Sequence, residues 1–445
     1  MFRKSIFIAA HELGNRAFYP TYQKLVRDQW KTYDDLKCEQ EKQLRHLIQF
    51  SYENVPYYRQ LFKEQKLSPH DIRTIEDLEK IPVLTKEIIK GRWDEFKPAG
   101  LSSMKYDTRA TGGSTGTPLQ YRVSNYDRFL NGALLYRGWG YGGYNLGDRM
   151  VFLAGSSLDV GTKPWLVERI HEIARNIRKL SSFDMAHAEM RQYASVMNSF
   201  KPRFMMGYAS SIYFFANWAM ENRVAVPQLE GVFTTAEKLY PNMRETIGEV
   251  FRCGVYDTYG LNDGGVTAFE CTEHSGLHID SDRSIMEVVD ADHHQLDQGQ
   301  GEILATSLYN FAMPFIRYST DDLATLGDAE CSCGRHTQML DELVGRSVDF
   351  LVTPGGKHVH GWFFLYIFWK YCKGIKEYQI VQNSIENIEI KLVLEDGFEV
   401  EQLNKIKEII SLKSPSWKLQ FHFVDKIERT MAGKYKFIIN EMERK

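Results

Sequence analysis

The sequence predicts an α/β fold that is divided into more than one domain. Its 445 residues exceed what a single hydrophobic core usually holds, so we expect two or three domains. Hydrophobic residues make up 43% of the chain and aromatic residues 13%, which is enough to fill well-packed interiors. Between residues 149 and 235, apolar runs that resemble buried strands alternate with helical patterns. This alternation is typical of a sheet covered by helices on both faces.

Residues 1–100 are predicted to be helical. A long amphipathic stretch runs from Tyr33 to Gln49, and capping residues at Ser68 and Thr74 open two shorter helices. After residue 118 the periodicity changes repeatedly between that of strands and that of helices. The resulting prediction is a strand at Leu119–Val123, a helix at Asp127–Tyr136, a strand at Arg149–Ala154, helical structure over 163–200, a strand at Pro202–Gly207, a helix at Ser210–Asn222, a strand at Gly231–Thr235 and a hairpin over 288–306.

The N-terminus superficially resembles a targeting segment. Arg3 and Lys4 precede the apolar run Ile6–Ala10, but His11 and Glu12 end that run far short of a membrane span. We therefore expect a short helix that could touch a membrane or a partner, and no transmembrane segment.

Charge and cysteine content narrow the class of protein. The net charge of −3 provides no general attraction for nucleic acid, and the basic run from Arg169 to Lys179 is interpreted as the solvated face of a helix. Six cysteines are few for this length and are not spaced like a disulfide framework. This usage fits a reduced compartment, so we expect a cytoplasmic protein.

A glycine-rich loop is the first candidate binding site. Residues 111–118 read Thr-Gly-Gly-Ser-Thr-Gly-Thr-Pro, and such a loop can direct several backbone N–H groups and hydroxyls at a polyphosphate. No lysine follows Gly116, so the loop is not a Walker A motif. A plain surface turn is the alternative interpretation.

Two other patterns suggest chemistry that their context argues against. Residues 138–143 match G-x-G-x-x-G, but they follow a helical run and lead into a strand, the reverse of a dinucleotide-binding motif. His293 and His294 could suggest an acyltransferase or metal site, but they fall in the predicted hairpin turn.

Several further peptides occur in a fixed order along the chain, and together with the glycine-rich loop they resemble the motifs of the adenylate-forming superfamily. The branch that the chain resembles is the phenylacetate–CoA ligase family, in particular its members from surface-polysaccharide loci. The resemblance runs from about Glu41 to Phe437. The peptides that carry it are residues 111–118, 235–237, 256–263, 315–323, 345–349 and 428–436.

The resemblance implies an ATP/AMP site. In the family the loop holds phosphates, the 235–237 turn contacts adenine, an aromatic residue offers adenine a flat face, and an aspartate accepts the ribose hydroxyls. In this sequence the implied nucleotide-binding residues are Thr111, Gly112, Gly113, Ser114, Thr115, Gly116, Ala236, Glu237, Asp257, Thr258, Tyr259, Gly260, Asp322 and Arg346.

The implied catalytic residues are Lys434, Asp263 and Thr115. Lys434 would neutralise charge on the attacking carboxylate and the α-phosphate, and Asp263 would help to hold Mg²⁺. The chain departs from the family pattern at two positions, since Asp263 replaces the usual glutamate and Asp321 replaces a glycine. A shorter carboxylate must approach the metal or reach it through water. A buried Arg–Asp ion pair is the alternative interpretation of residues 317–322.

The resemblance also implies the domain organisation. Residues 1–349 would form a large domain that binds ATP and the acid, and residues 350–445 a small α+β domain that moves between half-reactions about Asp349. Aromatic residues near Tyr208, followed by Ala209–Ser211, would wall the acyl pocket or fill the core.

The implied activity is ATP-dependent activation of a small-molecule or sugar carboxylate to an acyl-adenylate, followed by transfer to CoA. The first alternative is transfer to an amine, which forms an amide on a uronic acid or amino sugar in a membrane-associated polysaccharide pathway. Adenylyl transfer to a hydroxyl and a retired, nucleotide-binding scaffold are further alternatives. The sequence leaves a monomer and a homodimer equally open.

Cysteine spacing suggests a second site. Cys271, His278, Cys331 and Cys333 supply three thiolates and an imidazole, the donor set of a tetrahedral zinc site. Cys331 and Cys333 are spaced more tightly than in a zinc ribbon, so buried free thiols are the alternative. A structural metal in some members of the family favours zinc. His274 is the second choice of imidazole ligand.

Overall fold

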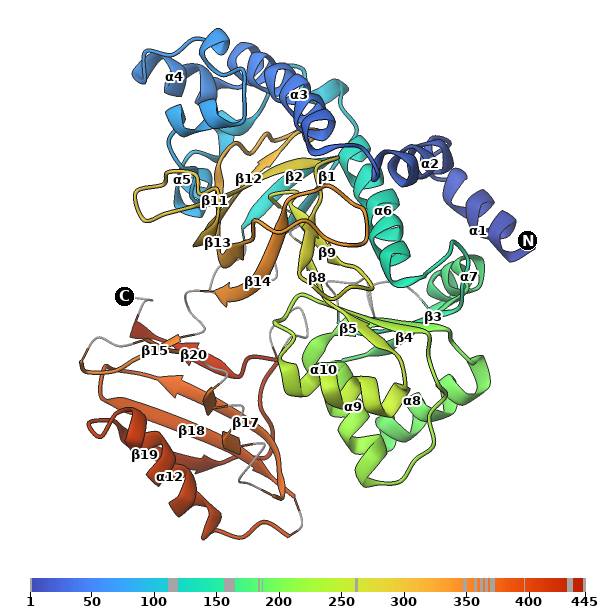
Figure 1. Cartoon of the computed structure of the whole chain (residues 1–445), viewed down its shortest axis with the longest axis vertical. Coiled ribbons are helices and arrows are strands. Elements are labelled where there is room, and N and C mark those ends of the chain that lie inside the picture. Colours follow the sequence, from blue (N-terminus) through green and yellow to red (C-terminus); the bar gives the residue numbers. More distant parts are fainter. Residues whose placement is uncertain are drawn as a thin grey trace. The chain divides into compact units, whose positions relative to one another are not determined.

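The chain divides into two compact units, Met1–Val344 and Gly345–Lys445. Figure 1 shows a computed structural model of the chain. It describes residues 2–110, 119–155, 165–182, 185, 187–260, 263–346, 350–355, 358–360, 363–364, 367–368, 373–395, 397–429 and 435–442.

The N-terminal part is helical, as predicted. Apolar residues of its helices pack onto a large sheet in one hydrophobic core, which includes Leu44, Tyr58 and Phe96 from the helices and Ile303 and Tyr318 from the sheet. The two segments predicted to start at Ser68 and Thr74 are single 3-10 turns rather than α-helices, Pro69–Asp71 and Glu76–Lys80. The α-helices are α1 (Phe2–Glu12), α2 (Phe18–Asp28), α3 (Tyr33–Asn54), α4 (Pro56–Glu64) and α5 (Lys86–Gly91).

A five-stranded sheet with the order β4-β3-β5-β6-β7 is parallel throughout. It confirms the α/β alternation predicted from the sequence, and Figure 1 shows α8, α9 and α10 beside it. Its strands are β3 (Met150–Ala154), β4 (Ile177–Ser181), β5 (Phe204–Tyr208), β6 (Gly231–Thr235) and β7 (Gly254–Tyr256). Its helices are α6 (Asn125–Trp139), α7 (Trp165–Arg175), α8 (His187–Phe200), α9 (Ala209–Glu221) and α10 (Pro241–Phe251).

One stretch of this unit was predicted wrongly. Helical structure was expected across 163–200, but β4 separates α7 from α8. The basic run is therefore no single helix face, because Arg178 and Lys179 lie on the strand. Its residues are not simply solvated either, since Lys179 pairs with Glu168 at 3.3 Å.

A seven-stranded sheet has the order β11-β12-β13-β14-β10-β9-β8. The predicted hairpin is confirmed as β11 and β12, which pair antiparallel from Ser284 opposite Ser307 to Val289 opposite Glu302. A separate two-stranded ribbon joins β1 (Tyr106–Ala110) to β2 (Gln120–Ser124). The strands of the large sheet are β8 (Thr258–Gly260), β9 (Thr267–Glu270), β10 (Leu277–Ile279), β11 (Ser284–Val289), β12 (Gly299–Ser307), β13 (Tyr318–Leu326) and β14 (Met339–Arg346).

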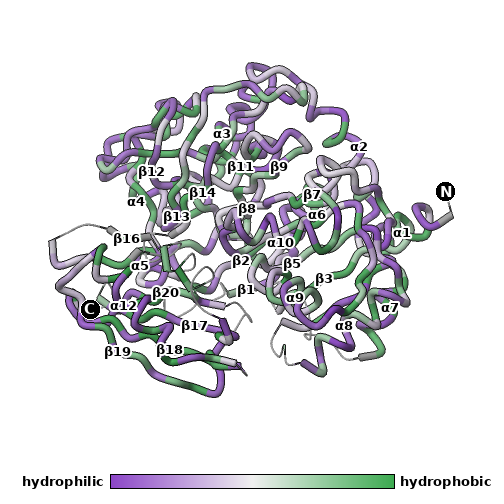
Figure 2. The backbone as a smooth tube through the Cα atoms, turned by 60° about the horizontal axis from the view of Figure 1, so that its bottom comes forward, coloured by the Kyte–Doolittle hydropathy of each residue, from purple (hydrophilic) through white to green (hydrophobic). Residues whose placement is uncertain are grey.

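The C-terminal unit is α+β, as the resemblance implies. A four-stranded sheet of order β19-β18-β17-β20 packs through Ile380 and Ile390 against Ile406 and Ile410 of α12, together with Trp417, which directly precedes β19. In Figure 2 apolar (green) and hydrophilic (purple) stretches alternate along these strands. The elements are β15 (Phe350–Val352), β16 (His358–His360), β17 (Ile375–Gln382), β18 (Asn387–Leu394), α12 (Gln402–Lys413), β19 (Lys418–Phe423) and β20 (Ile438–Asn440).

The glycines of the G-x-G-x-x-G match serve close packing. A Cβ atom on Gly138 would lie 2.3 Å from the ring of Phe269, and one on Gly142 would lie 2.8 Å from Phe233 and Tyr256. These glycines let α6 and the turn after it approach both sheets. Across the described ranges, no helix is long and apolar enough to cross a membrane.

Candidate functional site

Two of the sequence-predicted motifs meet through a reciprocal pair of hydrogen bonds. The hydroxyl of Tyr259 donates to Oδ2 of Asp322 at 2.9 Å. The hydroxyl of Tyr318 donates to Oδ2 of Asp263 at 2.8 Å. All four residues are buried. Each motif therefore supplies one tyrosine and one aspartate, and the tyrosine of each holds the aspartate of the other.

Curvature of the large sheet makes this meeting possible. Tyr259 lies on β8, and Asp322 lies on β13, yet β14, β10 and β9 separate these two strands in the hydrogen-bonding order. Neighbouring strands lie about 4.8 Å apart, so a flat sheet would hold the two side chains roughly 19 Å from each other. The sheet must curl for them to bond, which brings these two candidate nucleotide-binding residues together.

A second link joins this group to the parallel sheet. Thr234, near the C-terminal end of β6, donates its hydroxyl to Oδ1 of Asp257 at 2.8 Å. The backbone N–H of Thr258 donates to the same oxygen at 2.9 Å. Burial raises the pKa of Asp257 to about 6, although the hydrogen bond from Thr234 acts in the opposite direction. The carboxyl ends of parallel strands are where open α/β sheets usually bind ligands.

The turn after β6 has a strained backbone. Ala236 adopts a φ of 67°, a left-handed conformation that is unfavourable for a residue with a Cβ atom. Residues with such strained backbone conformations are concentrated at functional sites. The next residue, Glu237, accepts the backbone N–H of Ser210 at 3.0 Å and so caps the first turn of α9. A role for Glu237 in holding this turn was not foreseen from the sequence.

One of the two departures from the family pattern, Asp321, has a structural explanation. Asp321, which replaces a glycine of the family pattern, has a φ of 61°, and aspartate tolerates this region better than most residues. Its carboxylate pairs with Lys86 at the start of α5. Arg317 pairs with Glu287 at 3.0 Å, so the alternative of an Arg–Asp ion pair within this peptide is wrong for Arg317 and Asp322.

The remaining candidate residues fall outside the part of the chain that the structure describes. They are the glycine-rich loop, including Thr111, Gly112, Gly113, Ser114, Thr115 and Gly116, as well as Asp349 and Lys434. Arg346 ends β14, and its side chain is likewise outside the described part. Gly260, the last residue of β8, is exposed and directly follows Tyr259.

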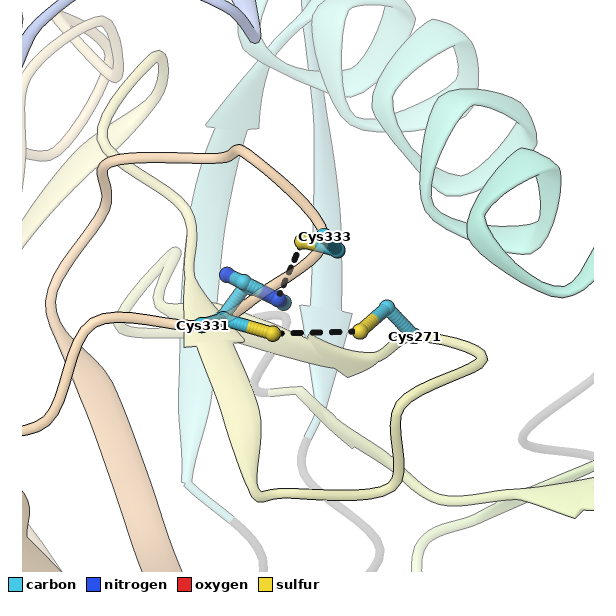
Figure 3. A group of neighbouring side chains, drawn as sticks. Cys271, Cys331 and Cys333 are labelled. Atoms are coloured by element: carbon cyan, nitrogen blue, oxygen red, sulfur yellow. Dashed lines mark hydrogen bonds between the residues drawn. The ribbon is translucent and has the colours of Figure 1, made fainter.

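The predicted metal ligands lie together in unit Met1–Val344. The ligand atoms of Cys271, His278, Cys331 and Cys333 all lie within 4.8 Å of one another. The Cys271 and Cys331 sulfurs are 3.6 Å apart, and Cys333 Sγ is 3.4 Å from His278 Nε2, contacts that are drawn in Figure 3. Tetrahedral zinc with ordinary bond lengths would place such atoms about 3.8 Å and about 3.6 Å apart. The donor set and spacing thus fit one zinc ion.

Neighbouring side chains hold these four groups. Thr337 lies 3.1 Å from His278 Nδ1, so it can fix the ring with Nε2 turned to the sulfurs. Burial lowers the pKa of His278 to about 4, which keeps the imidazole neutral. Ser275 lies within hydrogen-bonding distance of Cys331 Sγ, at 3.3 Å. His274, the second choice of ligand, instead stacks on Tyr256 with ring centroids 5.0 Å apart.

The structure shows hydrogen-bond partners of the candidate site residues that the sequence motifs did not reveal. Tyr318 was missed as the partner of Asp263, although it lies within a motif already identified. Glu270 was also missed: its Oε2 accepts the backbone N–H of Asp257 at 2.6 Å and it pairs with Arg244 at 3.0 Å. Because Glu270 precedes Cys271, one end of β9 contacts both the nucleotide-site candidate and the metal cluster.

The fold is that of the adenylate-forming CoA ligases. The chain superposes on 2-hydroxyisobutyryl-CoA ligase in its postadenylation state with a TM-score of 0.74 at 18% identity, covering 94% of this chain and 92% of that one. It also matches ATP-bound MatB from Rhodopseudomonas palustris with a TM-score of 0.51 at 13% identity, covering 76% and 67% of the two chains.

Sequence comparison identifies related proteins. Protein CapK from Staphylococcus aureus is 24% identical over 416 residues, which cover 92% of this chain and 90% of CapK. Phenylacetate-coenzyme A ligases from Thermus thermophilus and Escherichia coli are 26% and 27% identical over 348 residues, covering 72% and 75% of this chain and 73% and 76% of theirs. Residues 351–441 match the model of the CapK C-terminal domain. The predicted resemblance to phenylacetate–CoA ligases is thereby confirmed.

Proposed function

We propose that this protein is an AMP-forming ligase that uses ATP to convert a carboxylic acid into an acyl-adenylate. The observation that carries the proposal is the reciprocal pairing of Tyr259 with Asp322 and of Tyr318 with Asp263. It gathers residues from two motifs into one buried group, as a shared nucleotide site requires. The relatedness to phenylacetate–coenzyme A ligases supports the same reaction class.

The proposed nucleotide contacts are those that the resemblance implies. Asp322 would accept the ribose hydroxyls, Tyr259 would lie against adenine, and Asp257 would accept the adenine amino group. A hydrogen bond from a hydroxyl to a carboxylate is stronger than one to a neutral acceptor. Arg346 would contact ribose or phosphate, and residues 111–116 would hold the departing pyrophosphate.

The chain's own residues would act mainly by positioning and by stabilising charge. The acid's carboxylate attacks the α-phosphorus of ATP, the bond to the β-phosphate oxygen breaks, and pyrophosphate leaves. Lys434 would offset the charge that develops at the phosphorus. Asp263 suits Mg²⁺, which commonly takes one or two protein carboxylates together with substrate phosphates. Magnesium would neutralise phosphate charge when bound.

The acceptor of the acyl group is proposed to be the thiol of CoA. In that second step the thiol attacks the acyl carbon, AMP leaves and a thioester forms. An amine acceptor is the second candidate, the alternative that the sequence left open; residues 351–441 match the model of the CapK C-terminal domain. An amine of an amino sugar, or one that joins a uronic acid, would then yield an amide in polysaccharide assembly.

We also propose that Cys271, His278, Cys331 and Cys333 bind a structural zinc ion. The site lies beside β9 and β10, so its role would be to hold these strands. Each cysteine in the described ranges is a free thiol, which suits the reduced cytoplasm.

Product analysis tests the proposed function. The protein is incubated with ATP, Mg²⁺ and a panel of aromatic, aliphatic and sugar carboxylates, each with CoA, an amino sugar or no acceptor. We expect AMP and pyrophosphate with at least one acid, and acyl-CoA as the product with CoA. An amide product would assign the amine alternative, and ADP formation would contradict an AMP-forming ligase.

A further inference from the structure

The helix α7 (Trp165–Arg175) has four aliphatic side chains on the outside. Leu166, Val167, Ile170 and Ile173 are 61%, 43%, 58% and 54% exposed. They recur with the three- and four-residue spacing that places them on one face of the helix. An amphipathic helix of a protein surface normally turns this face towards the core. Here the face forms a continuous exposed stripe, which usually marks an interaction site.

The inner side of α7 carries charge instead. Glu172 is buried, and it pairs with Arg169 at 2.9 Å and accepts the backbone N–H of Lys179 at 2.9 Å. Glu168 pairs with Lys179 at 3.3 Å. The carboxylates of α7 are thus turned inward and neutralised, so the exposed stripe has no negative charge of its own.

The helix α1 packs against α7 and brings further cations to the same region. Both views place these helices side by side (Figures 1 and 2). His11 lies near enough to α7 for the charge of Arg175 to contribute to the lowering of its pKa, which burial mainly causes. The helix is anchored by the buried Phe7, whose ring packs edge-on against Tyr136 of α6 with ring centroids 5.1 Å apart. Three cations around α1 remain exposed, namely Arg3, Lys4 and Arg16.

The charge of this region decides which of two partners would cover the exposed stripe, a second copy of the chain or a membrane. The segments 2–16 and 165–182 carry more arginine and lysine than acid, whereas the whole chain has a net charge of −3. A second copy docked through the same face would bring like charges together, which disfavours a symmetric dimer. An anionic lipid surface complements the cations and can take up the aliphatic side chains at its headgroup boundary.

We propose that α1 and α7 form a docking surface for an anionic membrane. Leu166, Val167, Ile170 and Ile173 insert at the interface while Arg3, Lys4 and Arg16 face anionic headgroups. Since no helix in the described residues can span a bilayer, the contact is peripheral. This inference does not depend on the proposed ligase activity.

Vesicle sedimentation of the purified full-length protein tests it. We expect the protein to sediment with vesicles of phosphatidylcholine and phosphatidylglycerol, to remain in solution with phosphatidylcholine alone, and to dissociate as salt is raised. The double variant Leu166→Ser/Ile170→Ser should lower the partition coefficient by at least about tenfold, because it removes two of the aliphatic side chains that would leave water on binding. The charge variant Arg3→Glu/Lys4→Glu should weaken binding and its salt dependence together.

A matched control is Leu412→Ser, which changes an 80% exposed leucine at the end of α12 and should bind like the original protein. Melting curves of all variants separate lost binding from lost folding. The proposal is overturned if the folded protein does not sediment with anionic vesicles. It is also overturned if light scattering shows a dimer that Leu166→Ser/Ile170→Ser converts to a monomer, since a second copy would then cover the face.

Discussion

The hydroxyl of Tyr259 donates to Asp322 at 2.9 Å, although the two residues are 63 positions apart and lie on strands that are not neighbours. This contact fixes the carboxylate that we assign to the ribose hydroxyls against the ring that we assign to adenine. Because both residues are buried, their geometry is set before a nucleotide arrives. Preorganised groups of this kind lose less entropy on binding.

Replacing Asp322 should weaken ATP binding. Asp322→Ala removes a charge-assisted acceptor worth about 1.5 to 3 kcal/mol, so we expect an affinity loss of roughly ten- to a hundredfold. Tyr259→Phe keeps the ring and should cost less. Isothermal titration calorimetry with ATP and Mg²⁺ measures the ATP affinity of both variants. Asp292→Ala, an exposed aspartate in the β11–β12 turn, is the control and should bind normally. Unchanged affinity in Asp322→Ala would make that residue purely structural.

Nucleotide affinity should depend on the protonation of Asp257. Its pKa of about 6, raised mainly by burial, means that the carboxylate becomes protonated as the pH falls from 7 to 5. The charged acceptor for the adenine amino group is then lost, and we expect ATP to bind several-fold more weakly at pH 5. Asp257→Asn should bind weakly without this pH dependence. A variant that retains the full dependence would assign the titration to another group.

The same raised pKa has a defined effect on stability. The unfolded chain releases the Asp257 proton near pH 3.8 and the folded chain near pH 6, so this group makes folding less favourable as the pH rises through that window. Removing the titration by Asp257→Asn should flatten that part of the stability curve, as measured by urea unfolding at several pH values.

The left-handed backbone at Asp321 predicts an unusual ranking of substitutions. Asp321→Ala and Asp321→Gly both lose the pair with Lys86, but alanine also has a Cβ atom at a φ of 61°. We therefore expect Asp321→Ala to be less stable than Asp321→Gly by about 1 kcal/mol. Urea unfolding of the two variants measures the difference directly. An alanine variant as stable as the glycine one would show that this conformation relaxes at little cost.

The metal cluster predicts about one zinc per chain, as elemental analysis of freshly purified protein can determine. Cys333→Ser should abolish tight binding and lower the melting temperature, whereas Cys38→Ser, an exposed free cysteine on α3, should do neither. Thr337→Ala removes the partner of His278 and should weaken zinc affinity by roughly ten- to a hundredfold. Protein that is folded and fully stable without metal would identify the cluster as buried thiols.

Local sequence patterns were sufficient to predict an element of secondary structure where one face of that element is buried. The helical start, the parallel strands β3, β5 and β6, and the β11–β12 hairpin were predicted on this basis. The strand β4 was missed because its two buried residues, Ile177 and Leu180, are three positions apart, as on a helix. That spacing, between two true helices, gave no reason to expect a strand.

The site could be predicted in part because its motifs are short and occur in a fixed order along the chain. The sequence identified Tyr259 and Asp322 separately, but their contact depends on the curl of a seven-stranded sheet, which no local pattern specifies. Similarly, spacing did not separate His274 from His278. The choice comes from β10, which pairs with β9 and carries His278 to the sulfurs, while His274 turns to Tyr256.

A C-terminal unit that moves between half-reactions, as the resemblance implies, would require Lys434 in only one of them. Lys434→Ala, supplied with a chemically prepared acyl-adenylate, should transfer the acyl group to its acceptor at close to the normal rate, as followed by AMP release. Equal impairment in both halves would point to misfolding or to a lysine that stays in place.

Acid-dependent exchange of radiolabelled pyrophosphate into ATP tests adenylate formation most directly, because it reports the reversible first step without any acceptor. The account predicts exchange with the cognate acid, a loss on the order of 10² to 10³ in Lys434→Ala by analogy with deleted oxyanion donors, and normal exchange in Lys436→Ala. Exchange that is absent with every acid of the panel, or that survives undiminished in Lys434→Ala, would contradict the assignment of this chain as an adenylate-forming ligase.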